Sequence, residues 1–62
     1  MTWELWEKDG GQEKTFIPQN HPQHEWLTKG STKVWEVEAS SDDEAYTLRN
    51  EHLGWAPYKP MS

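Results

Sequence analysis

Five tryptophans and no cysteine occupy a chain of only 62 residues. A chain this short buries about 60% of the surface that it exposes when unfolded, so its stability margin is thin. Without cysteine, neither disulfides nor thiolate zinc sites can add stability, as they do in many small domains. Large aromatic rings can add stability instead, because each buries roughly 150 to 250 Å² and replaces several aliphatic side chains. The composition therefore predicts one domain, residues 1–62, with an aromatic-rich core.

Hydrophobic alternation at the start of the chain predicts a β-hairpin. Along residues 2–7, Trp3 points to one face and Trp6 to the other, with the period of two that a strand requires. The Asp-Gly-Gly sequence at residues 9–11 is typical of a tight turn, because these residue types tolerate positive φ. Residues 14–17 follow as a second strand. We expect the two strands to pair in antiparallel fashion.

The middle of the chain contains one ambiguous segment and one clear strand. Pro22 suits a first helical position, so residues 22–29 form either a short helix that ends before Gly30 or a structured loop. Residues 33–39 alternate again, which predicts a third strand. In this strand Val34 is expected on the face opposite Trp35.

The last third of the chain predicts a helix over residues 41–53. Ser41 and Glu44 have the spacing of a capping box, in which each side chain bonds a free N–H at the helix start. Gly54 stands where a left-handed C-cap belongs. Residues 55–62 carry two prolines and are expected to be extended. The helix should pack on the sheet through Ala45, Leu48 and Leu53.

These elements together predict an α+β fold. We expect a small, three-stranded, mainly antiparallel sheet with the order β-β-short helix or loop-β-α. The C-terminal helix would cover one apolar face, which satisfies the two-layer rule. The strand order in space is left open, because the long segment before the third strand allows it to join either edge.

No group of residues predicts catalysis, a cofactor or a metal. His21, His24 and Glu25 are close in sequence, but Pro22 interrupts them and His52 would have to be brought over by the fold. We interpret His21 and His24 as solvated loop residues and His52 as a residue at the core boundary.

The carboxylates of the expected strands are also interpreted as solvated. Glu4, Glu36 and Glu38 should lie on polar strand faces, relieved by Lys14 and Lys33 across the strands. Acid–base chemistry would need a pocket that raises one carboxyl pKa, and nothing in the sequence indicates a pocket. We therefore predict that the protein is not an enzyme.

The candidate interaction patch consists of Trp6, Val34, Trp55 and Tyr58. Trp6 and Val34 belong to the sheet face opposite the expected core, where an apolar patch is unusual unless something covers it. The tail is one cover, with Trp55 and Tyr58 packed over these residues or along the edge of the helix. A second copy of the chain or another protein is the alternative, since exposed tryptophan and tyrosine are common interface anchors.

Charge limits the classes of partner. Eleven acidic and six basic residues give a net charge of −5, and the basic residues form no cluster in the sequence. Nucleic acids and anionic membranes are therefore not expected partners. No signal peptide or membrane-spanning run is recognisable, and a bacterial-type cytoplasm is the expected location.

The leading functional hypothesis is a non-enzymatic protein–protein interaction or regulatory module that binds an unknown protein or forms a homodimer. One alternative is a binder of a small ligand or carbohydrate that uses exposed tryptophan and tyrosine rings. Another is an acidic mimic of nucleic acid, in which carboxylates imitate phosphates.

Overall fold

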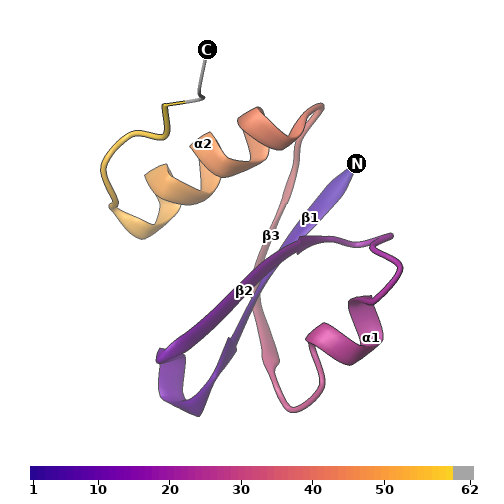
Figure 1. Ribbon diagram of the computed structural model, residues 1–62. Helices are drawn as coiled ribbons and strands as arrows, with labels where there is room; N and C mark the ends of the chain where they lie inside the picture. Colours follow the sequence, from indigo (N-terminus) through magenta and orange to yellow (C-terminus); the bar gives the residue numbers. More distant parts are fainter. Residues whose placement is uncertain (60–62) are drawn as a thin grey trace.

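The computed structural model describes residues 1–59, and it confirms the predicted α+β fold (Figure 1). The expected extended tail runs to residue 62, so its last three residues lie outside the described part. The elements, in chain order, are β1 (Thr2–Lys8), η1 (Asp9–Gly11), β2 (Glu13–Pro18), α1 (His24–Leu27), β3 (Thr32–Glu38) and α2 (Asp42–Leu53).

The sheet has the order β2-β1-β3, and both pairings are antiparallel. The central strand, β1, pairs its Leu5 with Phe16 of β2 and with Trp35 of β3. The turn between β1 and β2 is the 3₁₀ turn η1, and its three residues all have positive φ, including Asp9 at 55°. The sequence signal for a turn was thus correct, although the turn is longer than a two-residue hairpin loop.

A β-bulge in β3 changes the predicted position of Val34. The register pairs Leu5 with Trp35 and then Trp6 with Lys33, so Val34 is an extra residue on β3. The strict alternation predicted for this strand is therefore wrong at one point. Lys33, rather than Val34, lies across from Trp6, and Val34 remains 48% exposed.

The predicted caps of α2 are present. The Ser41 hydroxyl accepts a hydrogen bond from the Glu44 amide at 3.1 Å, and Gly54 closes the helix with φ 73°. A capping box also requires the Glu44 carboxylate to bond the Ser41 amide, and this second hydrogen bond is not formed. The carboxylate instead accepts hydrogen bonds from the amide and hydroxyl of Ser40, each at 3.1 Å.

The core lies between α2 and one face of the sheet. Trp3, Ala39 and Ala45 are buried at its centre. Partly buried side chains surround them, namely Phe16, Val37, Tyr46 and Leu48. Trp3 stacks on Phe16 with ring centroids 5.2 Å apart, so aromatic packing does replace aliphatic bulk in this core.

The segment after α2 packs along that helix. The Trp55 amide donates to the carbonyl of Asn50 at 2.9 Å, and the Asn50 side chain donates to the carbonyl of Ala56 at 3.1 Å. Tyr58 packs on Tyr46 with ring centroids 5.3 Å apart. Two positions were proposed for the tail. The structure places it along the edge of α2 and not over Trp6 and Val34.

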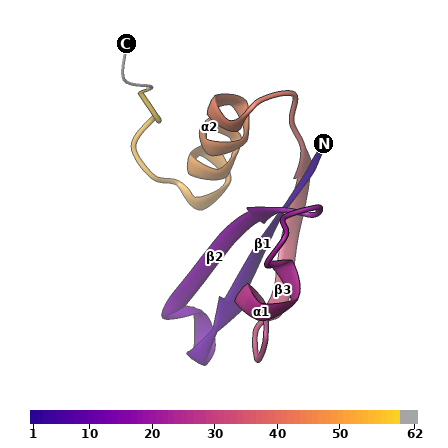
Figure 2. The same ribbon diagram turned by 45° about the vertical axis from the view of Figure 1, so that its right-hand side comes forward.

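The short helix α1 and its flanking loops lie on the other side of the sheet from α2 (Figure 2). Of residues 22–29, for which the sequence allowed a helix or a loop, only His24–Leu27 are helical. Since Glu4 and Trp6 point away from the α2 face, α1 and its loops are the elements that can cover them.

Candidate functional site

A buried carboxylate lies beneath α1. Glu4 is on β1, the central strand, and its side chain is only 4% exposed. Burial of a charged carboxylate costs several kcal/mol unless partners compensate for the lost water. The interpretation of Glu4 as a solvated residue is therefore wrong, because residues 19–28 fold over this face of the sheet.

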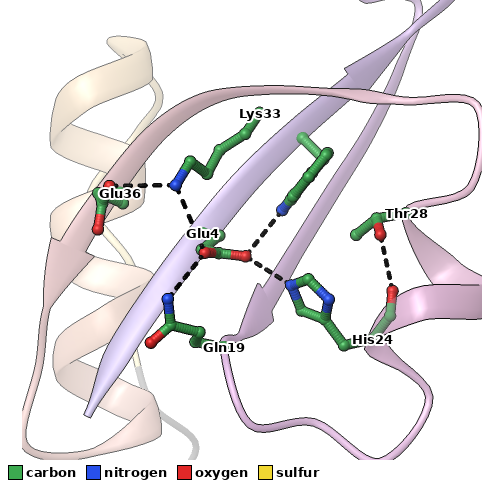
Figure 3. Close-up of polar contacts among 7 residues, drawn as sticks. Glu4, Gln19, His24, Thr28, Lys33 and Glu36 are labelled. Atoms are coloured by element: carbon green, nitrogen blue, oxygen red, sulfur yellow. Dashed lines mark hydrogen bonds and ion pairs between the residues drawn. The ribbon is translucent and has the colours of Figure 1, made fainter.

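His24 of α1 is the closest partner of Glu4. Its Nε2 atom lies 2.5 Å from Oε1 of Glu4, although the two residues are 20 positions apart in the chain (Figure 3). An ionised carboxylate only accepts hydrogen bonds, so Nε2 must carry the proton. His24 is thus a structural contact of the sheet, and its interpretation as a solvated loop residue is also wrong.

Three further groups complete the surroundings of the carboxylate. Trp6 Nε1 donates to Oε1 at 3.0 Å, and Gln19 Nε2 donates to Oε2 at 3.3 Å. Lys33 Nζ lies 3.7 Å from Oε2 and also contacts Glu36 at 3.2 Å. Figure 3 shows Lys33, His24 and Gln19 converging on Glu4 from β3, α1 and the loop after β2. We call these five residues, Glu4, Trp6, Gln19, His24 and Lys33, the Glu4 cluster.

The Glu4 cluster stabilises the charged form of its carboxylate. Burial acts to raise the pKa of Glu4, but the hydrogen bonds from His24 and Trp6 and the positive charges of His24 and Lys33 outweigh it. The pKa of Glu4 consequently lies below its usual value of 4.5. In the described residues, no buried side-chain nitrogen or oxygen lacks a hydrogen-bond partner.

The cluster fixes α1 in place and leaves the outer side of the helix uncovered. The Thr28 hydroxyl and amide both donate to the carbonyl of His24, at 2.8 and 3.0 Å, which closes the helix around the partly buried histidine. Trp26, two residues further along the helix, points away and is 74% exposed. An open hollow adjoins it, lined by Pro22, Gln23, Glu25, Trp26 and Lys29. We call these five residues the Trp26 surface.

The residues of the predicted patch do not form one surface. Trp6 packs edge-on against the His24 ring at 5.7 Å, under α1. Val34 is exposed at the bulge of β3. Trp55 and Tyr58 lie beside α2, where Trp55 faces the guanidinium of Arg49 at 5.2 Å and Tyr58 donates to Asp43 at 3.2 Å. The tail residues and the sheet residues are thus separated by the core.

The histidines do not gather either. His21 accepts a hydrogen bond from the Gln23 amide at 3.0 Å, and His52 stacks flat on Trp35 with ring centroids 4.1 Å apart. Across residues 1–59, no group of three histidine, aspartate or glutamate side chains could hold a metal ion.

Sequence reasoning missed both the Glu4 cluster and the Trp26 surface. One signal was available for the cluster: Glu4 and Trp6 share a strand face, and the following segment supplies Gln19 and His24 as polar partners. The position of Trp26 had no comparable signal, since a tryptophan in a short helix is more often buried.

Comparison with protein-family models, curated proteins and solved structures finds no match for this chain. Within residues 1–59, no helix has the length and apolar character needed to cross a lipid bilayer.

Proposed function

We propose that this domain is a non-enzymatic interaction module that binds a basic segment of a partner protein on the Trp26 surface. The exposure of Trp26 is the observation that carries the proposal. An indole that is 74% exposed contributes little hydrophobic stabilisation to the fold, although this small domain has few apolar residues. Tryptophan is also among the residues most enriched at the energetic centres of protein interfaces.

Charge supports a basic partner. The chain has a net charge of −5, which attracts cationic segments and repels a second copy of itself. An exposed indole face also attracts lysine and arginine side chains through the cation–π interaction. In the Trp26 surface, Glu25 can pair with a cation of the partner, whereas Lys29 opposes one.

Residues of the Trp26 surface are held by a defined scaffold, which also supports the proposal. The Glu4 cluster fixes α1 through His24, so Trp26 projects from a helix that is already folded. Pre-organisation lowers the entropy that binding must overcome. We place the module in the cytoplasm as part of the proposal, because a chain without cysteine suits a reducing compartment.

Selection of random displayed peptides on the purified domain tests the proposal. We expect peptides rich in lysine and arginine to be enriched, and Trp26→Ala to abolish their capture. Val34→Ala is the matched control, since Val34 is also exposed but lies on β3. Enrichment that Trp26→Ala leaves intact, or enrichment of acidic peptides, would contradict the proposal.

A charge exchange on the Trp26 surface makes the test sharper. Glu25→Gln should weaken binding of the selected basic peptide about threefold, and Lys29→Gln should strengthen it by a similar factor. Both effects should shrink at high salt, because exposed charges are screened. Equal effects of the two substitutions would contradict recognition of a cation.

A carbohydrate is the second candidate ligand. The exposed Trp26 ring can stack on a sugar, and Gln23 and Glu25 supply hydrogen-bonding groups in the same hollow. A glycan array probed with the wild-type domain and Trp26→Ala tests this candidate. Binding of a glycan that depends on Trp26, together with no peptide enrichment, would replace the protein partner by a sugar.

A further inference from the structure

We propose that the contact between Glu4 and His24 is a pH-sensitive latch that docks α1 on the sheet and thereby regulates presentation of the Trp26 surface. The regulatory part of this inference rests on the proposed function. The latch itself rests on the structure of the Glu4 cluster, which joins a buried carboxylate on the central strand to the helix that carries Trp26.

The chemistry of the cluster makes the latch sensitive to the charge of His24. Among the groups that contact Glu4, Trp6 and Gln19 are neutral donors. Lys33 is 3.7 Å away and is shared with Glu36. Only a protonated His24 brings a positive charge into hydrogen-bond contact with the buried carboxylate. A neutral imidazole with its proton on Nε2 still donates to the carboxylate, so protonation of His24 adds a positive charge to this contact and turns the hydrogen bond into an ion pair.

Other titratable groups around the pair set its surroundings. Lys33 and Glu36 approach from β3, and His21 and Glu25 are the nearest titratable neighbours of His24 along the chain. The contacts from the β2 side come from the neutral Gln19. His21 accepts a backbone hydrogen bond instead of facing the carboxylate. A charge change at His24 is therefore the change that acts most directly on Glu4.

The attachment of α1 to the sheet depends strongly on this pair. α1 has only four residues, and none of them is buried. A helix this short is not stable by itself in water, so its position depends on tertiary contacts. Histidine side chains change charge between about pH 5 and pH 8. Loss of the positive charge on His24 should therefore weaken docking, and gain of that charge should strengthen it, while Nε2 keeps its hydrogen bond to Glu4.

Amide hydrogen exchange measures docking without any ligand. The amides of Leu27 and Thr28 bond to carbonyls of Gln23 and His24 at 2.9 and 3.0 Å, so their protection reports whether α1 is formed. We expect their protection factors to fall about fivefold or more between about pH 6 and about pH 8. The indole N–H resonance of Trp6, which bonds the same carboxylate, should shift over the same pH interval as the amide protection.

Two variants distinguish the latch from a general effect of pH. In His24→Gln, the protection of the two amides should be low and equal at both pH values, and the Trp6 signal should not titrate in this range. His52→Gln is the control, because His52 stacks on Trp35 on the α2 side and should leave the response of α1 unchanged. A response that persists in His24→Gln, or equal protection at both pH values in the wild type, overturns the latch.

Binding of the selected basic peptide at the two pH values tests regulation separately. We expect the wild type to bind more tightly at about pH 6 than at about pH 8, and His24→Gln to lose this difference. If α1 protection changes with pH but peptide affinity does not, the regulatory part is overturned and the latch stands. If no peptide binds at either pH, the proposed function fails, whereas the exchange result still decides the latch.

Discussion

The indole Nε1 of Trp6 donates a hydrogen bond to Oε1 of Glu4 at 3.0 Å, although both residues belong to the same strand. The two side chains lie two positions apart on one face of β1, and the Trp6 ring also meets the ring of His24 edge-on. Trp6 therefore contacts both Glu4 and His24 and encloses one side of their hydrogen bond. This contact explains how a tryptophan outside the main core is partly covered without the tail.

Replacement of the buried carboxylate should destabilise the fold. Glu4→Gln turns one acceptor oxygen into a donor amide that faces other donors, and it removes the charge that His24 and Lys33 neutralise. We expect the free energy of unfolding to fall by about 2 to 3 kcal/mol. Urea unfolding measures the change. Glu36→Gln, at a half-exposed position on β3, should cost under about 0.5 kcal/mol, and equal small effects would contradict the role of Glu4.

Acid should destabilise the protein through the same carboxylate. The folded-state pKa of Glu4 lies below its usual value of 4.5, so the folded state binds fewer protons than the unfolded state in this range. The stability that ionised Glu4 contributes is therefore fully present above about pH 4.5 and is lost as pH falls through the lower folded-state pKa.

Unfolding curves at a series of acidic pH values test this expectation. Stability of the wild type should decline more steeply below about pH 4.5 than that of Glu4→Gln. Glu38, whose pKa is also lowered by its hydrogen bonds to the chain amino group and Thr2, remains in both proteins and cancels in the comparison. Identical slopes would show that Glu4 does not titrate differently on folding.

Loss of the α2 cap should have a moderate cost. Ser41→Ala removes the hydroxyl that accepts from the Glu44 amide, and we expect a loss of about 1 kcal/mol. Ser31→Ala serves as the control, because Ser31 follows α1 and caps no helix. Thermal or urea unfolding of both variants provides the measurement. A cost no larger than that of Ser31→Ala would show that the cap contributes little.

Removal of the tail should destabilise α2 and the core beside it. Truncation after Gly54 exposes Tyr46 and Arg49, and it leaves the Asn50 amide without the carbonyl of Ala56. At roughly 25 cal/mol per Å² of apolar surface, we expect a loss of about 2 kcal/mol. Tyr58→Phe should have little effect, because its bond to Asp43 is exposed. A truncated protein as stable as the full chain would contradict the role of the tail.

Much of the fold was predictable because its signals are local. Each of these signals depends on residues that are close together in the sequence. They are the alternation in residues 2–7, the turn at residues 9–11 and the caps at Ser41 and Gly54. The bulge at Val34 was not predictable, since it arises from the pairing of β3 with β1. Local patterns cannot report a register that two distant strands set together.

The candidate site was less predictable for the same reason. Glu4 looks solvated on its own strand, and it is buried only because residues 19–28 return over that face. His24 looks like a loop residue until the fold brings it to Glu4. The direction of Trp26 follows from the same contact, because the side of α1 that carries His24 faces the sheet.

A heteronuclear NMR titration with the selected basic peptide locates the binding surface. We expect the shifted signals to be confined to residues 21–29, with the indole N–H of Trp26 among the largest changes and the signals of α2 unaffected. We also expect a weaker response at the same peptide concentration in Glu4→Gln, where α1 is less firmly docked. Shifts centred on the β3 edge or on Trp55 and Tyr58, with the Trp26 indole unchanged, would contradict the claim that the Trp26 surface is the binding surface.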